Sequence, residues 1–114
     1  MATTRTLTLD ERVINRLSSF AGDRIEDKIL YLVSEVVMAK LRECNERIAS
    51  FEFRYGMPFN QFNAAWDKDQ IPDKHSYSME ADYMEWEALE MEKQHWLAVA
   101  RDLSPTPPQE LVSA

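Results

Sequence analysis

Hydrophobic residues recur along most of this chain at steps of three and four, the spacing that places side chains on one face of an α-helix. The longest such run begins near residue 25 and continues to residue 55. Its members are Leu30, Val33, Val37, Leu41, Cys44, Ile48, Phe51 and Tyr55. The pattern predicts one helix of about 32 residues, roughly 48 Å long at 1.5 Å per residue, that ends at Gly56.

From Val37 onward, this stripe approximates the heptad seam of a coiled coil. The seam lasts about two and a half repeats, whereas a coiled coil usually needs three or four. A helix of this length cannot be covered on all sides by a compact globule of 114 residues. We therefore expect it either to break, or to pair with the last helix of the chain and with a second subunit.

The region before the long helix predicts a short strand and a short helix. Residues 6–9 alternate threonine and leucine, as a strand with two different faces does. Residues 10–21 carry a helical apolar stripe, for which Thr8 or Asp10 is the expected N-cap and Gly22 the expected stop.

Two more helices are predicted after the long one. The first is short and carries Phe59, Phe62 and Trp66 on one face, and a polar loop follows it. The second is expected over residues 76–103, because an apolar stripe runs through it and prolines in residues 104–108 end it. The stripe consists of Tyr83, Trp86, Leu89, Trp96, Val99, Ala100 and Leu103.

The fold class that these elements predict is mainly α. We expect a long antiparallel helix pair with two shorter helices, and a short N-terminal β-ribbon that forms only on dimerisation. Residues 1–103 are expected to form a single helical domain, followed by a proline-rich tail at residues 104–114.

The net charge of −7 is distributed unevenly along the chain. Residues 1–48 carry eight basic and eight acidic side chains, so the whole excess lies on residues 49–114. Within the predicted domain, a neutral half at 1–48 is thus joined to an acidic, aromatic half at 49–103. Two halves that differ in this way indicate two surfaces with different partners.

Composition excludes several classes of protein. With one cysteine, the chain can form neither an intrachain disulfide nor a zinc site made of several cysteines, and with two glycines it cannot build a phosphate-binding loop. No run of 18 apolar residues is present, and the first residues lack an apolar core followed by a small-residue cleavage site, so we expect no secretion signal. We expect a cytoplasmic protein that does not span a membrane and binds no cofactor.

The N-terminal region resembles a known family of DNA-binding proteins. The segment TLTLDERVINRL at residues 6–17, followed by Phe20, Ala21 and a second helix, is similar to the ribbon-helix-helix regulators of prokaryotes, over residues 4–41. The resemblance implies a homodimer whose paired strands enter the major groove of operator DNA. The residues that would contact DNA are Thr4, Arg5, Thr6 and Thr8.

The loop that follows this segment departs from the family pattern. Its members usually present a glycine and hydroxyl-rich loop to phosphate, whereas this chain has Asp23 and Glu26 there, in an acidic version of the helix capping box. Carboxylates at this position would repel phosphate. Residues 1–48 also lack the basic excess that DNA binding normally requires.

Residues 44–103 resemble a second family. The segments FEFRYGMPF at 51–59, IPD at 71–73 and DYMEWEAL at 82–89 are similar to a small prokaryotic family of antitoxin-like and uncharacterised proteins. The resemblance implies a cognate toxin, nuclease-like in character, that the C-terminal part of this chain binds.

The tract at residues 80–92 is the best candidate for that contact, because aromatic side chains lie among carboxylates there. The predicted partner-binding residues are Tyr83, Trp86, Glu87 and Glu90, with Phe59, Phe62 and Trp66 as a second patch. The alternative is an ordinary amphipathic helix whose apolar face packs on the long helix.

Other chemically capable residues have simple structural explanations. Glu92 and His95 have the Glu-x-x-His spacing of di-metal centres, but no second copy is present, so a helix surface is the better explanation. His75 lies beside Ser76, which is expected to cap the last helix, and Cys44 is expected to be a buried thiol. We predict no catalytic residue and no metal site.

The function that follows is that of a protein-interaction module. The first hypothesis is the antitoxin of a toxin–antitoxin pair, which neutralises a nuclease-like toxin by direct binding. The alternative is a dimeric, autoregulatory ribbon-helix-helix regulator, and a metal-dependent enzyme is a distant third.

Overall fold

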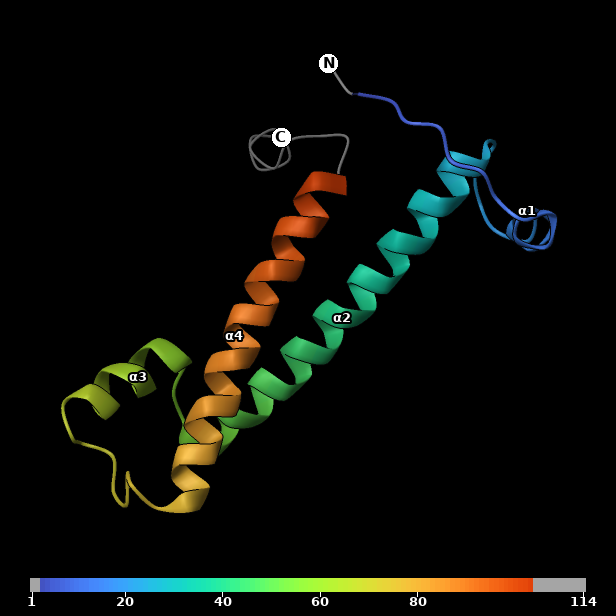
Figure 1. Cartoon of the computed structure of the whole chain (residues 1–114). Coiled ribbons are helices and arrows are strands. Elements are labelled where there is room, and N and C mark those ends of the chain that lie inside the picture. The colour runs from blue at the N-terminus through green and yellow to red at the C-terminus, as the bar shows by residue number, and fades with distance from the viewer. Residues whose placement is uncertain (1–2, 104–114) are drawn as a thin grey trace, which may run out of the picture. The chain divides into compact units, whose positions relative to one another are not determined.

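The computed structural model describes residues 3–103, which form four helices and no strand. In chain order these are α1 (Glu11–Leu17), α2 (Ile25–Tyr55), α3 (Phe59–Asp67) and α4 (Tyr77–Leu103) (Figure 1). The mainly α fold with a long helix pair is thereby confirmed. The predicted proline-rich tail at residues 104–114 lies outside the described residues.

The chain divides into two compact units. We call Met1–Val36 the N-terminal unit and Val37–Ala114 the C-terminal unit. The boundary falls inside α2, twelve residues before residue 48, where the neutral half of the sequence ends. α2 is nevertheless one continuous helix of 31 residues, so it does not break.

The helix α1 begins where the sequence predicts and ends earlier. The carboxylate of Asp10 accepts a hydrogen bond from the backbone N–H of Arg12 at 2.8 Å, so Asp10 is the N-cap, and this hydrogen bond lowers its pKa. The helix ends at Leu17 because the Ser18 hydroxyl donates to the Asn15 carbonyl at 2.6 Å and the chain leaves the helix in turns. Only Leu17 is buried in the described part of the N-terminal unit.

The start of α2 corrects the predicted capping box by one residue. Asp27, not Glu26, reaches back, and its carboxylate accepts from the backbone N–H of Arg24 at 3.3 Å. The Arg24 guanidinium donates to the same carboxylate at 3.2 Å and lowers the pKa of Asp27. The Arg24–Asp27 pair thus takes the capping role that the sequence assigned to Asp23 and Glu26.

The other end of α2 is as predicted. Gly56 has a φ of 70°, a left-handed conformation that suits glycine, and its N–H donates to the Glu52 carbonyl at 2.8 Å. The chain turns there and α3 begins after Pro58. Ser76 caps α4, as predicted, because its hydroxyl accepts from the backbone N–H of Met79 at 3.3 Å.

The core of the C-terminal unit lies where α2, α3 and α4 meet. α2 and α4 run antiparallel (Figure 1), and the pair is bridged by Arg47 to Glu85 at 2.7 Å and by Arg54 to Asp82 at 2.8 Å. The buried stripe of α2 reproduces the predicted heptad seam from Val37 to Phe51. The buried cluster contains Cys44, Ile48, Phe51, Phe62, Trp86 and Leu89.

Candidate functional site

Of the aromatic residues that the sequence predicts as a partner surface, Phe62 and Trp86 lie in the core of the C-terminal unit, and the other three pack against that core. The ring centroid of Trp86 lies 5.4 Å from that of Phe51 and 5.0 Å from that of Phe62. Phe59 completes the group, with its ring 5.3 Å from Trp86 in an edge-on arrangement. Such offset and edge-on contacts are favourable for aromatic rings.

Two of the predicted contact residues are completely buried. Phe62 and Trp86 both have a relative exposure of 0%. We therefore remove them from the predicted contact surface, because a side chain that its own fold covers completely cannot contact another protein. For Trp86 and Leu89 the alternative explanation holds, since the apolar face of α4 packs against α2.

Three other predicted residues are partly covered. Phe59, Trp66 and Tyr83 pack against the core and keep some exposed surface. The rings of Trp66 and Tyr83 stack with centroids 4.4 Å apart, and the Tyr83 hydroxyl donates to Asn63 Oδ1 at 2.6 Å. Burial, together with the nearby carboxylate of Glu87, raises the pKa of Tyr83. These contacts fix the position of α3 on α4.

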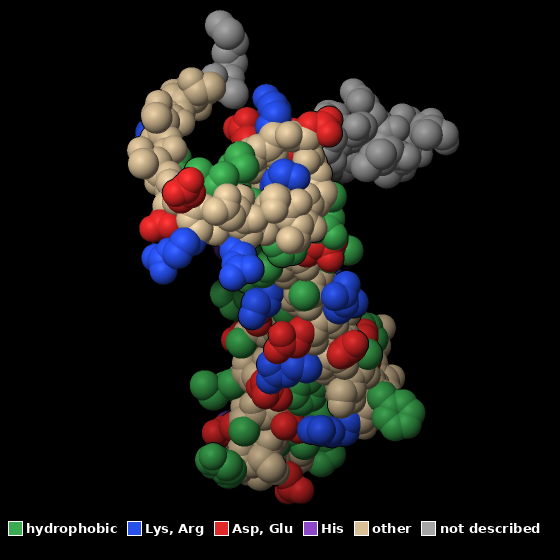
Figure 2. All heavy atoms as spheres, turned by 90° about the vertical axis from the view of Figure 1, so that its right-hand side faces the viewer, with side chains coloured by type: hydrophobic (Ala, Val, Ile, Leu, Met, Phe, Trp, Pro, Cys, Tyr) green, Lys and Arg blue, Asp and Glu red, His purple; other side chains and the backbone are tan. Residues whose placement is uncertain are grey.

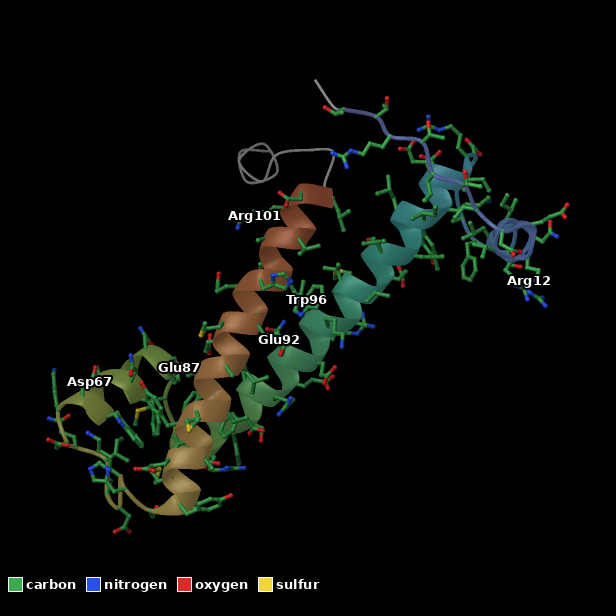
Figure 3. The ribbon with its side chains drawn as sticks, in the orientation of Figure 1. Arg12, Asp67, Glu87, Glu92, Trp96 and Arg101 are labelled. Atoms are coloured by element: carbon green, nitrogen blue, oxygen red, sulfur yellow. The ribbon has the colours of Figure 1, made fainter. Side chains whose placement is uncertain are left out.

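The predicted carboxylates remain at the surface. Glu87 is exposed and Glu90 is partly exposed. Figure 3 shows Glu87 on the side of α4 toward α3, and Glu92 on the side toward α2. On the face drawn in Figure 2, acidic and basic side chains are interspersed with hydrophobic ones over the lower part of the molecule. Of the predicted contact residues, Glu87 and Glu90 thus keep exposed surface, whereas Phe62 and Trp86 have none.

A polar contact holds the lower ends of α2 and α4 together. The Tyr55 hydroxyl donates a short hydrogen bond to Asp82, and the Arg54 guanidinium donates to the same carboxylate. Burial is the first cause that raises the pKa of Tyr55, and the neighbouring Asp82 carboxylate is the second. Because the phenol and the guanidinium both hold one carboxylate of the facing helix, this contact is a structural clamp.

Sequence reasoning missed the outer face of α4, which points away from the core. Tyr77 is 90% exposed, and Met84 and Met91 are each 68% exposed. The three lie seven residues apart, so they share one side of the helix. The small exposed residues Ala81 and Ala88 lie between them. The signal was present as a second spacing of four and three through α4, opposite the stripe that contains Trp86.

The residues with catalytic or metal-binding potential lie apart from one another. His75 is exposed, and its Nδ1 is 3.1 Å from Glu80 Oε1. Glu92 accepts a 3.4 Å hydrogen bond from the Trp96 indole, and His95 is exposed on the surface of α4. Among residues 3–103, no three His, Cys, Asp or Glu side chains are close enough to hold a metal ion.

Cys44 is buried, as predicted. Its relative exposure is 2%, and burial and the nearby Glu92 carboxylate raise the pKa of the thiol. A thiol that is covered and kept protonated is a poor nucleophile.

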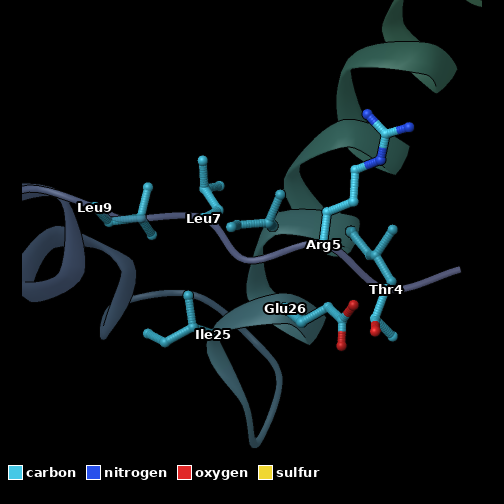
Figure 4. Close-up of a pocket in the computed structure, with 8 residues that line it drawn as sticks. Thr4, Arg5, Leu7, Leu9, Ile25 and Glu26 are labelled. Carbon is cyan, nitrogen blue, oxygen red and sulfur yellow. The ribbon is translucent and has the colours of Figure 1, made fainter.

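The predicted DNA contacts lie on an extended segment of the N-terminal unit. Thr4, Arg5, Thr6 and Thr8 are all exposed, and no strand pairing involves residues 3–10. The segment passes over the first turns of α2 and encloses a groove of about 590 Å³ that includes Arg5, Leu7 and Glu26 (Figure 4). Asp23 and Glu26 are both exposed, and Glu26 lines this groove.

Comparisons with known proteins add no relative. No protein-family model matches the chain, and no curated protein or solved structure matches it either. Both sequence resemblances therefore stay predictions. None of the helices within residues 3–103 is long and apolar enough to cross a membrane.

Proposed function

We propose that this protein is a protein-interaction module, and that it acts in the cytoplasm as the antitoxin of a toxin–antitoxin pair. One observation carries the proposal: α4 turns its aromatic face into the core of its own unit and leaves its carboxylates exposed. Asp82 and Glu85 are held by Arg54 and Arg47 of α2. Glu87 is exposed and Glu90 partly exposed, so these two carboxylates can reach a partner.

Neutralisation would proceed by occupation of a basic groove. A nuclease holds the phosphates of its substrate with Lys and Arg, and carboxylates such as Glu87 and Glu90 can pair with the same cations. No bond is made or broken in this mechanism, so inhibition is stoichiometric. Because exposed ion pairs contribute to it, affinity falls as the salt concentration rises.

Co-expression with the product of the adjacent small reading frame tests the proposal. That product alone is expected to stop growth, and this chain is expected to restore growth and to co-purify with it. The double variant Glu87→Gln and Glu90→Gln should bind about tenfold more weakly, which corresponds to 1.4 kcal/mol. The matched control changes Glu43 and Glu46 of α2 to Gln and should bind normally. A harmless product, or one that does not co-purify, contradicts the proposal.

The proposal includes a homodimer formed through the N-terminal unit. Residues 1–36 carry five basic and six acidic side chains, so two copies would meet with little net repulsion. The large hydrophobic residues that this unit leaves at least 39% exposed are Leu7, Val13, Ile14, Phe20, Leu30, Tyr31, Val33 and Val36. Sedimentation velocity tests this: Leu30→Asp with Val33→Asp should shift the protein to a monomer, and a wild-type monomer at high concentration contradicts the dimer.

Operator binding is a second candidate function. The observation that favours it is the extended, unpaired and exposed segment at residues 3–10, which a second copy could pair into a ribbon. In an electrophoretic mobility assay at low salt, Thr6→Ala and Arg5→Ala should weaken binding to DNA upstream of the coding sequence. If the wild-type protein binds no DNA at low salt, this candidate is excluded.

A further inference from the structure

The outer face of α4 is built like one half of a coiled coil. Its seam consists of Tyr77, Ala81, Met84, Ala88, Met91 and His95, all exposed and separated alternately by four and three residues. The spacing is that of positions a and d, sustained over about two and a half heptads. From Tyr77 to His95 the seam extends for roughly 27 Å at 1.5 Å per residue.

The side chains on this seam suit a second helix. Ala81 and Ala88 are small enough to let a helix approach closely, since the distance between helix axes depends on the side chains at the contact. Met84 and Met91 lie on either side of Ala88, and methionine adapts its flexible side chain to a range of partners. A hydrophobic side chain that is 68% exposed gains from being covered.

Carboxylates border the seam on both sides. Glu80 and Glu87 occupy the g positions, and Glu85 and Glu92 occupy the e positions. Figure 3 shows that Glu87 and Glu92 lie on opposite sides of α4. Glu85 is paired with Arg47 of α2, whereas within residues 3–103 no Lys or Arg pairs with Glu80, Glu87 or Glu92.

The negative charge at these e and g positions determines which kind of helix can pack on the seam. A parallel pair of helices brings g of one against e of the other, and an antiparallel pair brings g against g and e against e. With glutamate at all four positions, a second copy of α4 would meet carboxylates with carboxylates in either orientation. Lys or Arg at the flanks of another helix would instead form favourable pairs.

We propose that the outer face of α4 docks a basic amphipathic helix of a partner protein, with apolar side chains on its seam and Lys or Arg along both flanks. The inference rests on the proposed function for the identity of that partner as a toxin, whereas the geometry and charge of the surface stand independently of it. It moves the contact from the buried Trp86 side of α4 to the opposite side.

A defined peptide provides the test. The probe is a labelled helical peptide of three heptads with Leu at a and d and Lys at e and g, and its control has Glu at e and g. Fluorescence anisotropy at low and at physiological salt is expected to show binding of the Lys peptide, weakened by salt, and no binding of the Glu peptide. Equal binding of both peptides, or of neither, overturns the proposal.

Two sets of variants locate the binding. Met84→Ser with Met91→Ser is expected to weaken binding of the Lys peptide at least tenfold, and Glu87→Gln with Glu92→Gln to remove most of its salt dependence. The matched control is Met38→Ser with Phe53→Ser, because both residues are exposed hydrophobic side chains of α2 in the same unit. If the control pair weakens binding as much as the methionine pair does, the face of α4 is not the site.

The remaining outcomes separate this inference from the proposed function. If Met84→Ser with Met91→Ser converts a wild-type dimer into a monomer, the face binds a second copy and the inference is overturned. If the variant still neutralises and co-purifies with the toxin, the inference falls while the antitoxin proposal stands. If the adjacent product is harmless but the Lys peptide binds as described, the antitoxin proposal falls while the docking face stands.

Discussion

Among single side chains, Trp86 combines the largest buried ring with an unusual polar atom. Its indole N–H is buried, and in the described part of the chain no acceptor lies within hydrogen-bond distance of it. A buried donor without an acceptor costs about 1–3 kcal/mol. The rings that enclose it, including Phe51 and Phe62, offer only their π-faces and edges.

Substitutions of Trp86 should separate the stability gained from its buried ring from the stability lost at its unpaired N–H. Trp86→Ala is expected to lower the free energy of unfolding by about 3–5 kcal/mol, because it leaves a large cavity. Trp86→Phe keeps an aromatic ring and removes the unpaired N–H, so we expect a loss of roughly 2 kcal/mol or less. Urea denaturation followed by circular dichroism measures both. Equal losses in the two variants would contradict this expectation, because the phenyl ring would then recover none of the lost packing.

Tyr55 links stability to alkaline pH. Its pKa is raised in the folded chain, so folding favours the protonated phenol, and this contribution is complete below the unfolded pKa of about 10. The contribution is lost as pH rises from that value through the raised pKa. The free energy of unfolding is therefore expected to fall above about pH 10.

Urea denaturation between pH 9 and 11 tests this expectation. Tyr55→Phe should reduce the alkaline loss of stability, because it removes the titrating hydroxyl. Tyr83→Phe should reduce it further, since the pKa of Tyr83 is also raised. A double variant with the same alkaline slope as the wild-type protein would contradict the argument.

Among the helices, the periodicity of the sequence predicted which elements exist better than it predicted their ends. The steps of three and four located α2 and α4 to within a residue or so, because part of each stripe is buried: residues from Val37 to Phe51 in α2, and Trp86 and Leu89 in α4. The end of α1 was placed too late because a local hydrogen bond from Ser18, which periodicity does not register, ends it first.

The candidate site was harder to predict for a different reason. An apolar stripe indicates that one face of a helix is covered. It does not indicate whether the same chain or a partner protein covers that face. The sequence therefore leaves the role of Trp86 open, and only the packing of α2 against it decides that its own chain covers it. The seam through Met84 and Met91 gives only a weak signal in the sequence, because methionine and alanine on an acidic helix differ little in hydropathy from their neighbours.

The two glycines should respond unequally to substitution. Gly56 has a φ of 70°, and a Cβ added there would meet nothing within 4 Å, so Gly56→Ala is expected to cost about 1–2 kcal/mol for the left-handed conformation alone. Gly22 has a φ of 125°, and an added Cβ would lie 2.9 Å from Asp27 Cβ and 3.0 Å from the Lys28 backbone nitrogen. Gly22→Ala should therefore displace the start of α2, whereas Gly56→Ala should displace no neighbouring residue.

Hydrogen exchange with mass spectrometry can compare the two variants. We expect faster exchange over residues 18–30 in Gly22→Ala, because the start of α2 must move, and a smaller change over residues 50–60 in Gly56→Ala. A larger effect at Gly56 would contradict the geometry.

Across the whole chain, the two units differ in how much they bury. In the described residues the N-terminal unit buries only Leu17, whereas the C-terminal unit buries the cluster around Trp86. Amides of α1 are therefore expected to exchange faster than amides of α2 between Cys44 and Phe51. Pulse-labelled hydrogen exchange at low protein concentration measures this. Equal protection in the two segments would indicate that the N-terminal unit has a partner even when dilute.

Cys44 gives this protein a built-in chemical reporter. It is the only thiol of the chain, and it lies in the cluster that the α2–α4 pair covers. A thiol reagent can modify it only while the helices are apart, so the modification rate measures how often the pair opens. A partner that stabilises the closed pair would slow the modification, and the slowing would report its binding free energy without any added label.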